Sequence, residues 1–486
     1  MSSEERRLHP VAMLIGAIKT IRRSLGAAIF PGVAFLMSQG FSTRTLALVA
    51  LGALVVAALA ALWGFLSWRA TTYAVSGNAF LLRTGVLQKN ERTIPLEHVQ
   101  SVDTVQGVIQ RAFGVFEVRV ETAGGGAGEP DASLAALDRP AAEALRREIE
   151  GSRREPVEAG EEAGPEVLRR LSTRDLLVAG ATSGQIGIAL SLLAVGSQVF
   201  DDVLPEGFVR DFIGALAPRS VTVVLALVLA AGLLAWLLAI AGTVLAYSGF
   251  TLSREGDFLY IKRGLLERRE ATIPLARIQA VRISEGVLRQ PFGLASLRVE
   301  SAGYGESAGV STTLFPLLPY KETHGFLLRA APEFAVAPEL EALPARALRR
   351  YVFRAIVPAL IVAGVATGIS FFVFGSTFGL LGLVLIPPAA AYGLLSYRDA
   401  GWAFEQDRLV VRSRSLARVT AIAPRRRLQS REVSLSPFQR RLHLATFSAQ
   451  VASGGGGAAV QVVDLEAGAA ESLAGELGPG SHSAPT

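Results

Sequence analysis

Residues Thr272–Gly303 read TIPLARIQAVRISEGVLRQPFGLASLRVESAG, and this stretch decides the fold of the chain. Apolar and polar residues alternate on both sides of a centre that contains Gly and Pro, a pattern typical of two strands joined by a short connection. The same pattern occupies Thr93–Gly124, TIPLEHVQSVDTVQGVIQRAFGVFEVRVETAG, at a constant offset of 179 residues and without a gap. A match of this length indicates an internal repeat.

A third and more divergent copy begins at Ile422 with IAPRRRLQSREVSLSPFQRRLHLATFSAQVASGG, at an offset of 329 from the first. It keeps Pro424 and Gln439-Arg440 but has Leu442-His443 where the others have Phe-Gly. A short alternating run precedes each copy, and a Gly-rich turn, a strand and a helix follow it. We therefore expect three modules, each a small barrel or curved sheet of five to seven strands with one C-terminal helix.

The rest of the chain is dominated by apolar stretches. Half of the 486 residues are hydrophobic and only 19% are charged, which excludes an ordinary soluble enzyme and a disordered chain. Uncharged stretches of about 20 residues cross a bilayer as helices. Six spans are predicted, namely Ser24–Phe41, Leu46–Trp68, Leu176–Phe200, Val221–Tyr247, Ala355–Phe374 and Phe378–Tyr397.

Details of three spans carry further expectations. The first span is short and contains Pro31, so a re-entrant or interfacial segment is its alternative. Gly180 and Gly184 in the third span predict close helix packing. Pro387-Pro388 predicts a kink in the last span, because neither residue can donate its backbone N–H.

The spans pair into three hairpins, so both termini and the three modules are expected on one side. The loops on the other side hold three of the 48 Lys and Arg residues, which by the positive-inside rule makes the modules cytoplasmic and the protein a multi-pass cell-membrane protein. Pro10–Arg23 is predicted to be an interfacial amphipathic helix, whose Lys19, Arg22 and Arg23 face anionic headgroups. A positive flank of the first span is a compatible interpretation.

The predicted domains alternate between membrane and polar parts. The boundaries are 1–69 for the interfacial helix and first hairpin, 70–150 for the first module, 151–175 for a polar linker, 176–247 for the second hairpin, 248–335 for the second module, 336–398 for a linker and the third hairpin, 399–478 for the third module and 479–486 for a disordered tail.

The third module is strongly basic. Between Trp402 and Ser453 ten Arg residues face three acidic residues, a net charge of +7. Such a cluster would dock on anionic lipid headgroups, at about 1 kcal/mol per charge, or on an acidic protein surface. The positive-inside bias explains part of the excess. The candidate lipid- or partner-binding residues are Arg412, Arg414, Arg418, Arg425, Arg426, Arg427, Arg440 and Arg441.

Other features have a structural interpretation. Phe113 and Phe292 are expected in the core, each followed by a Gly that permits a tight turn. Glu121 and Glu300 are each expected to form a solvated ion-pair stripe with the Arg two residues before it. The Gly runs after the strands do not fit a phosphate-binding loop and indicate turns.

Several kinds of chemistry find no support in the sequence. The chain has no Cys and five scattered His, so no metal site, disulfide or cofactor is expected. Neither a recognition helix nor aromatic stacking strands point to nucleic acid. No paired carboxylates, triad or metal cluster supports an enzyme of envelope or lipid metabolism.

The motifs together resemble those of the bacterial pleckstrin-homology (PH) domain membrane proteins, in particular the long, YdbT-like type with several modules. The resemblance is clearest in two stretches, TIPLARIQAVRISEGVLRQPFGLASLRVESAG and, from Arg426, RRLQSREVSLSPFQRRLHLATFSAQVASGG. The resemblance covers nearly the whole chain. It implies an α + β membrane protein made of three repeats, each a transmembrane helical hairpin followed by a PH-like split β-barrel with a C-terminal helix.

The resemblance also implies a function without catalytic residues, loosely linked to envelope stress and resistance to membrane-active antimicrobial peptides. The favoured hypothesis is non-catalytic binding or scaffolding at the inner membrane face. Its expected partners are membrane lipids, anionic ones included, and a membrane or cytosolic protein such as a shorter PH-domain membrane protein. The alternative is a transporter or channel subunit with the modules as a cytoplasmic regulatory assembly, against which stands the lack of charged residues within the spans.

Overall fold

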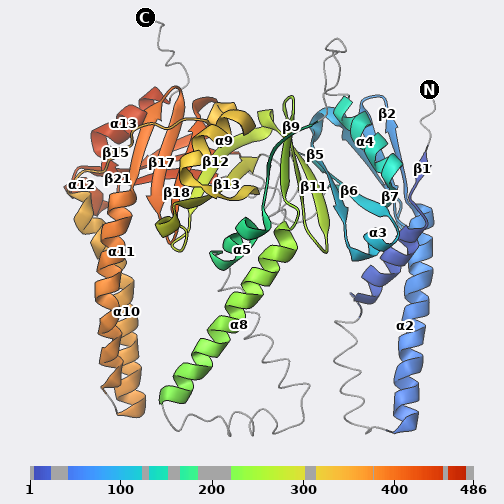
Figure 1. Cartoon of the computed structure of the whole chain (residues 1–486), viewed down its shortest axis with the longest axis horizontal. Coiled ribbons are helices and arrows are strands. Elements are labelled where there is room, and N and C mark those ends of the chain that lie inside the picture. Colours follow the sequence, from blue (N-terminus) through green and yellow to red (C-terminus); the bar gives the residue numbers. More distant parts are fainter. Residues whose placement is uncertain are drawn as a thin grey trace, which may run out of the picture. The chain divides into compact units, whose positions relative to one another are not determined.

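The computed structural model describes residues 5–22, 24, 42–122, 131–151, 165–183, 221–301, 313–375, 377–452 and 458–477 (Figure 1). The chain divides into two compact units. Unit 1 comprises Met1–Val167 and Gly249–Pro274, and unit 2 comprises Leu168–Ser248 and Leu275–Thr486.

Strands and helices recur in three sets with the predicted order of strands and a closing helix. The first set is β2 (Thr72–Ser76), β3 (Ala79–Thr84), β4 (Asn90–Pro95), β5 (Val99–Gln106), β6 (Val115–Thr122), β7 (Ala132–Asp138) and α4 (Arg139–Gly151). The second is β9 (Thr251–Glu255), β10 (Phe258–Arg263), β11 (Arg268–Pro274), β12 (Ile278–Glu285), β13 (Leu294–Ser301), β14 (Thr313–Pro319) and α9 (Thr323–Ala330). The third is β16 (Gly401–Glu405), β17 (Arg408–Arg414), β18 (Arg418–Pro424), β19 (Leu428–Ser434), β20 (Leu444–Val451), β21 (Ala458–Glu466) and α13 (Ala467–Glu476).

The sheets do not coincide with these sets. We call the first three strands of a set its front strands and the last three its rear strands. The rear strands of the first set continue into the front strands of the second through the antiparallel pair β5–β11, and those of the second continue into the third through β12–β18. The full orders are β1-β2-β3-β4, β7-β6-β5-β11-β10-β9-β8, β14-β13-β12-β18-β17-β16-β15 and β19-β20-β21, where β1 is Arg6–Arg7, β8 is Glu166–Arg170 and β15 is Glu341–Ala342.

The two connecting pairs, junction 1 (β5–β11) and junction 2 (β12–β18), have the same register. Gln106 lies opposite Arg268 in junction 1, and Glu285 lies opposite Arg418 in junction 2. These positions correspond under the offsets of the sequence repeat, so the repeated sequence produces the same pairing twice.

Each unit has an apolar core, formed mainly by the buried side chains of the alternating strands. In unit 1, Phe80, Leu134 and Leu145 are fully buried between strands and α4. In unit 2, the corresponding core gathers around Phe447 and Leu473 of the third set. Alternation places every second strand residue on the buried face, which is why the period-two pattern predicted these strands correctly.

Four helices among the described residues are long and apolar enough to cross a membrane. They are Thr43–Ala70 (α2), Leu229–Tyr247 within α8 (Val221–Tyr247), Ala347–Phe372 within α10 (Ala347–Phe374) and Phe378–Asp399. They contain the second and sixth predicted spans and most of the fourth and fifth. Most of their apolar side chains are exposed, as lipid-facing surfaces require.

The other two predicted spans fall largely outside the described residues. Of Ser24–Phe41, only residue 24 is described. Of Leu176–Phe200, residues 184–200 lie outside, and α5 (Thr173–Ala181) covers only its beginning. Gly180 does pack closely as predicted, because a Cβ there would lie 3.0 Å from the Cα of Ile240 in α8.

The last span begins as a 3-10 helix, η7 (Phe378–Leu385), and becomes α-helical in α11 (Ile386–Asp399). Pro387 and Pro388 occupy the first turn of α11, where a missing N–H leaves no intrahelical bond unmade. The predicted kink inside a continuous helix is therefore wrong, because the prolines start the α-helix. α10 and this span run side by side (Figure 1).

Small residues bring the two helices of this hairpin together. Gly379 and Gly382 face α10 so closely that an added Cβ would lie 2.3 Å from the Cα of Thr367 and 2.9 Å from the Cα of Ala363, respectively. Only glycine permits this approach, which is the packing mode favoured between helices in lipid.

The predicted N-terminal helix forms over residues 11–22. Ala12 and Ala17 are buried, and the helix packs against Gly64 of α2, where an added Cβ would lie 2.4 Å from the carbonyl oxygen of Met13. Lys19 and Arg22 are exposed, and residue 23 lies outside the described residues.

Candidate functional site at the junction of two sheets

The ionic network at junction 2 joins two sets of strands to a membrane-spanning helix. Glu285 ends β12 and is 2% exposed. Arg418 begins β18 and donates two hydrogen bonds to this carboxylate, from Nε over 2.8 Å and from a terminal nitrogen over 2.5 Å. This bidentate contact holds the pKa of Arg418 above its ordinary value.

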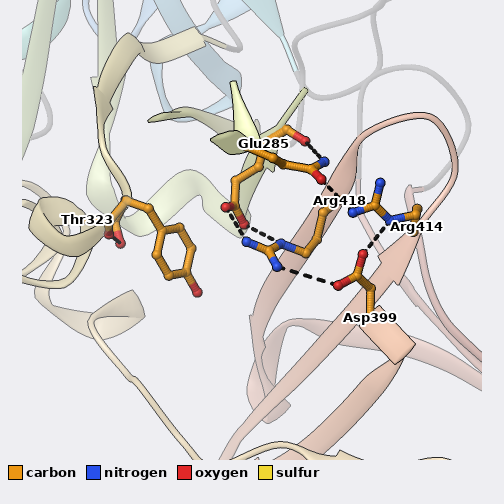
Figure 2. A network of polar contacts seen from close by, with 7 residues as sticks. Glu285, Thr323, Asp399, Arg414 and Arg418 are labelled. Atoms are coloured by element: carbon orange, nitrogen blue, oxygen red, sulfur yellow. Dashed lines mark hydrogen bonds and ion pairs between the residues drawn. The ribbon is translucent and has the colours of Figure 1, made fainter. Parts of the chain in front are cut away.

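Asp399, the last residue of α11, extends the network toward the membrane. Figure 2 shows Arg418 between the carboxylates of Glu285 and Asp399, with Arg414 on the other side of Asp399. A carboxylate at a helix C-terminus is unfavourable with the helix dipole, so two guanidinium groups compensate it here. Gln290 completes the set, because its amide oxygen accepts from Arg414 over 2.5 Å and its Nε2 donates to the Glu285 carbonyl over 2.8 Å.

Through this network, a movement of α11 would disturb the pairing of β12 with β18. Glu285 is almost fully buried, and a buried carboxylate that loses its partner destabilises a fold by about 3–5 kcal/mol. Junction 1 lacks this device, because Gln106 takes the position of Glu285 and donates to the Val115 carbonyl over 3.2 Å. The ion pair is therefore particular to junction 2, which contacts Asp399 at the end of the third hairpin.

The structure separates the eight predicted binding arginines into distinct surroundings. Arg414 and Arg418 belong to the junction network. Arg426 and Arg427 lie 2.7 and 3.9 Å from the carboxylate of Glu333, and Arg425 lies 3.7 Å from Asp407. Arg412 is half-buried in β17. The charges of these arginines other than Arg412 are thus largely compensated inside the protein.

Arg440 and Arg441 differ from the other six, because both are exposed and neither pairs with a carboxylate among the residues that the structure describes. They lie in the short helix α12 (Pro437–Arg441), between β19 and β20. Phe438 in the same helix is 68% exposed. Basic residues beside an exposed aromatic ring are typical of a segment that enters the interface of an anionic bilayer.

The corresponding loops of the other two sets also expose apolar side chains. Phe113 is 51% exposed and Phe292 is 71% exposed, so the prediction that both lie in the core is wrong. The pattern QGVIQRAFG has the composition of a buried turn, but the ring of Phe113 is half exposed. Neighbouring strand turns add further exposed apolar residues, namely Leu265 and Leu266 beside the first loop and Leu416 beside the second.

The loop with Phe292 is attached to a membrane-directed helix. Arg289 donates to the carbonyl of Ala179 over 3.3 Å and to the hydroxyl of Thr182 over 3.1 Å, both at the end of α5. Next to them, the carbonyl of Ala181 accepts from the indole N–H of Trp236 in α8 over 3.0 Å. The loop therefore lies at the level of Trp236 along α8.

This level is deep relative to the end of α8. The helix has 27 residues and ends at Tyr247, so it is about 40 Å long and Trp236 lies roughly 16 Å from that end. A bilayer core is about 30 Å thick, which leaves about 10 Å of helix outside it. If α8 crosses the bilayer and all of that excess extends on the module side, Trp236 would lie at the depth of the apolar core.

Glu121 and Glu300 occupy equivalent positions with different neighbours. Burial, and next the charge of Asp103, raise the pKa of Glu121 to about 7. In the second set Arg282 stands where the first set has Asp103, and its Nε donates to Glu300 over 2.7 Å. The predicted pairing of each Glu with the Arg two residues before it is wrong, since Arg119 pairs with Glu117.

Asp464 is a second buried carboxylate that ties a module to a span. It is 0% exposed and accepts from Arg350 over 2.9 Å and from Arg354 over 2.6 Å, both in the first turns of α10. Gln439 adds a third hydrogen bond over 2.8 Å. The third set is thus fixed to the beginning of α10 as well as to the end of α11.

Unit 1 contains a cleft of about 840 Å³ between α4 and the strands β9–β11. Arg139 pairs with Glu143 there, Lys262 pairs with Glu270, and Arg146 stacks over Tyr260 at 4.6 Å. Its charges are mostly compensated locally. Within the described ranges no group of three or more His, Asp or Glu side chains is arranged to hold a metal ion.

Comparison with known proteins adds three findings. The profile of a family described as Bacterial PH domain matches residues 22–153, 211–330 and 354–479. A relative from Bacillus subtilis (strain 168), the UPF0699 transmembrane protein YdbT, is 32% identical over 470 residues, which cover 93% of this chain and 94% of the relative. No significantly similar solved structure was found.

Proposed function

Since the chain belongs to the bacterial PH domain family, we propose that it is a non-catalytic scaffold whose PH-like modules bind the cytoplasmic leaflet of the cell membrane. The chain is built as three repeats of a transmembrane hairpin followed by a PH-like split β-barrel with a C-terminal helix. Supporting this, each matched segment contains at least one predicted span and one set of strands. The distribution of Lys and Arg supports the cytoplasmic orientation.

One observation carries the proposal, namely the exposed apolar loop fixed at the depth of Trp236. Val287, Leu288 and Phe292 project from this loop, and each is about half exposed or more. Complete burial of one such side chain in an apolar medium is worth about 1.5–3 kcal/mol. The loop therefore anchors the second module in the leaflet rather than above it.

The third module contacts the leaflet through charge as well as apolar surface. Arg440 and Arg441 are exposed beside Phe438, so they reach lipid phosphates while the ring enters the interface. The compensated arginines, such as Arg418 and Arg426, hold the scaffold together instead. A membrane-embedded scaffold of this kind fits a role in envelope stress or in resistance to membrane-active peptides.

Depth-dependent quenching tests the membrane contact. The chain has no Cys, so single cysteines carry a fluorescent label without background. Phe292→Cys and Leu416→Cys report on the apolar loop and the turn beside it. Glu405→Cys is the matched control. Glu405 is exposed and pairs with Arg408 at the start of β17, whereas Leu416 follows the end of β17.

Spin-labelled lipids in reconstituted vesicles are expected to quench the labels at positions 292 and 416 several-fold more than the label at position 405. Equal quenching at positions 405 and 416 would contradict insertion of the loops. Labelling of the three variants in intact cells by an impermeant thiol reagent tests the orientation separately, and strong labelling of position 405 would place the modules outside the cell.

A further inference from the structure

Among the strands that end the four sheets, two are equivalent to strands that form a junction elsewhere in the chain. β4 ends the sheet β1-β2-β3-β4, and β19 begins the sheet β19-β20-β21. The outer edge of a strand presents backbone N–H and C=O groups that form a template for another strand. Four residues of β4 in succession, from Asn90 to Thr93, are exposed, and so are alternate residues of β19.

These two edges are the two halves of a junction that the chain forms twice. In both junctions the first rear strand of one set pairs with the last front strand of the next set, and the register is the same. β19 is the first rear strand of the third set, and β4 is the last front strand of the first set. We propose that β19 of one copy pairs with β4 of a second copy. The rear strands of the third set would then continue into the front strands of the first set of the next copy.

The repeat defines the register of this intermolecular junction. In junction 2, Ser284 lies opposite Val419. The equivalent residue of Ser284 in the third set is Ser434, at an offset of 150, and the equivalent of Val419 in the first set is Asn90, at an offset of 329. Ser434 of one copy is therefore expected opposite Asn90 of the next.

Charge complementarity favours the same register. The built pair Arg282–Ala421 corresponds to Glu432 and Arg92 in the proposed junction. Opposite charges directly across an antiparallel pair contribute about 0.2–1 kcal/mol, whereas like charges repel. Both residues are exposed in the single chain, so the pair forms without removing a buried group. A shift by one residue would turn the side chains to the other face.

The membrane is compatible with this arrangement. A head-to-tail contact is heterologous, since one surface of each copy meets a different surface of the next. Rotation about the membrane normal keeps the spans of all copies in the same orientation. The inference rests on strand pairing alone and does not depend on lipid contact by the loops.

Disulfide trapping tests the proposal in purified, reconstituted full-length protein. Two differently tagged populations are co-expressed, one with Asn90→Cys and the other with Ser434→Cys, so that only a contact between copies yields the mixed disulfide. The register control replaces Ser434→Cys by Val433→Cys. The positive control is the double variant Ser284→Cys/Val419→Cys, which reports the efficiency of trapping at a junction already formed within the chain.

The proposal expects the mixed dimer at positions 90 and 434 with a yield comparable to the positive control, and at least tenfold less at positions 90 and 433. Arg92→Glu should lower the yield, and Arg92→Glu together with Glu432→Arg should restore it. No mixed dimer while the positive control forms would overturn the proposal. Equal yields in both registers would also overturn it. A chain that carries both Asn90→Cys and Ser434→Cys gives a further check, and a disulfide that forms only within that chain would overturn the proposal as well.

Discussion

Arg418 donates two hydrogen bonds to the carboxylate of Glu285 at the point where the rear strands of one set pair with the front strands of the next. The same guanidinium lies 3.5 Å from Asp399, where α11 ends. One side chain therefore connects two sets of strands and a membrane-spanning helix. The physical consequence is that a movement of α11 changes the electrostatic surroundings of a buried carboxylate.

Breaking this contact on one side is expected to destabilise the fold. Arg418→Met leaves the buried Glu285 charge without its bidentate partner and should lower the free energy of unfolding by about 3–5 kcal/mol. Glu285→Gln in the same background should recover part of this loss, because it removes the unpaired charge. Thermal unfolding in detergent measures both. If Arg418→Met melted like the parent chain, the network would have no structural role.

Asp464 provides a second test of coupling between module and span. Asp464→Asn removes the charge that binds Arg350 and Arg354 and should lower the melting temperature clearly. Glu466→Gln is the matched control. Glu466 pairs with Arg346 but is exposed, so its replacement should change the free energy of unfolding by no more than about 1 kcal/mol. Similar losses for the two variants would argue against the importance of burial.

Glu121 predicts an unusual pH dependence. Its pKa is about 7 in the folded chain against 4.5 for an ordinary Glu. The folded state therefore holds a proton that the unfolded state has lost, so this group's contribution is most favourable below pH 4.5, declines as the pH rises to 7 and is level above. Glu121→Gln should raise the melting temperature at pH 8 and have little effect at pH 5.

The second set supplies the control for this effect. Glu300 is paired with Arg282, so Glu300→Gln should lower the melting temperature at pH 8. Asp103→Asn should act like a weaker Glu121→Gln, because it removes one of the two main causes of the raised pKa of Glu121. A stabilising Glu300→Gln, or a Glu121→Gln effect without pH dependence, would contradict the assignment.

The third hairpin is expected to be sensitive to side-chain size. Gly382→Leu places a side chain where a Cβ alone would lie 2.9 Å from the Cα of Ala363, so α10 and the last span must separate. Gly364→Leu is the control, because nothing lies within 4 Å of a Cβ at that position of α10. Expression level and melting temperature should fall for the first variant and change little for the second.

Lipid preference should follow the exposed arginines. Arg440→Glu/Arg441→Glu is expected to reduce the anionic lipid that co-purifies with the protein several-fold, as measured by mass spectrometry of the extracted lipids. Arg425→Glu/Arg426→Glu changes the same amount of charge but alters residues near Asp407 and Glu333, so it should act mainly on stability. Equal loss of anionic lipid in both would favour a diffuse effect of net charge.

Sequence patterns predicted the local elements well, whereas the surroundings of the candidate arginines depend on the folded chain. Alternation located the strands around Val118 and Val299, because a strand buries every second side chain whichever strand it pairs with. The basic run Arg425–Arg427 had the composition of a lipid-binding cluster, but Glu333 is about 90 residues away in sequence and meets it only in the folded chain. The exposed Phe292 was missed because an apolar ring in a repeat has the same pattern in a core and in a leaflet.

What the chain's residues establish without coordinates is the set of apolar spans, the strands and the repetition of both, because these depend on composition and on spacing over a few residues. Which strands share a sheet was decided by tertiary structure. β12 has alternating faces that suit several neighbours, and only the folded chain brings Arg418 to Glu285 and selects β18 as its partner. Hydrogen bonds between strands carry no sequence signature of their own, so the continuation of one set's strands into the next, the junction network and the open edges of β4 and β19 emerge only in three dimensions.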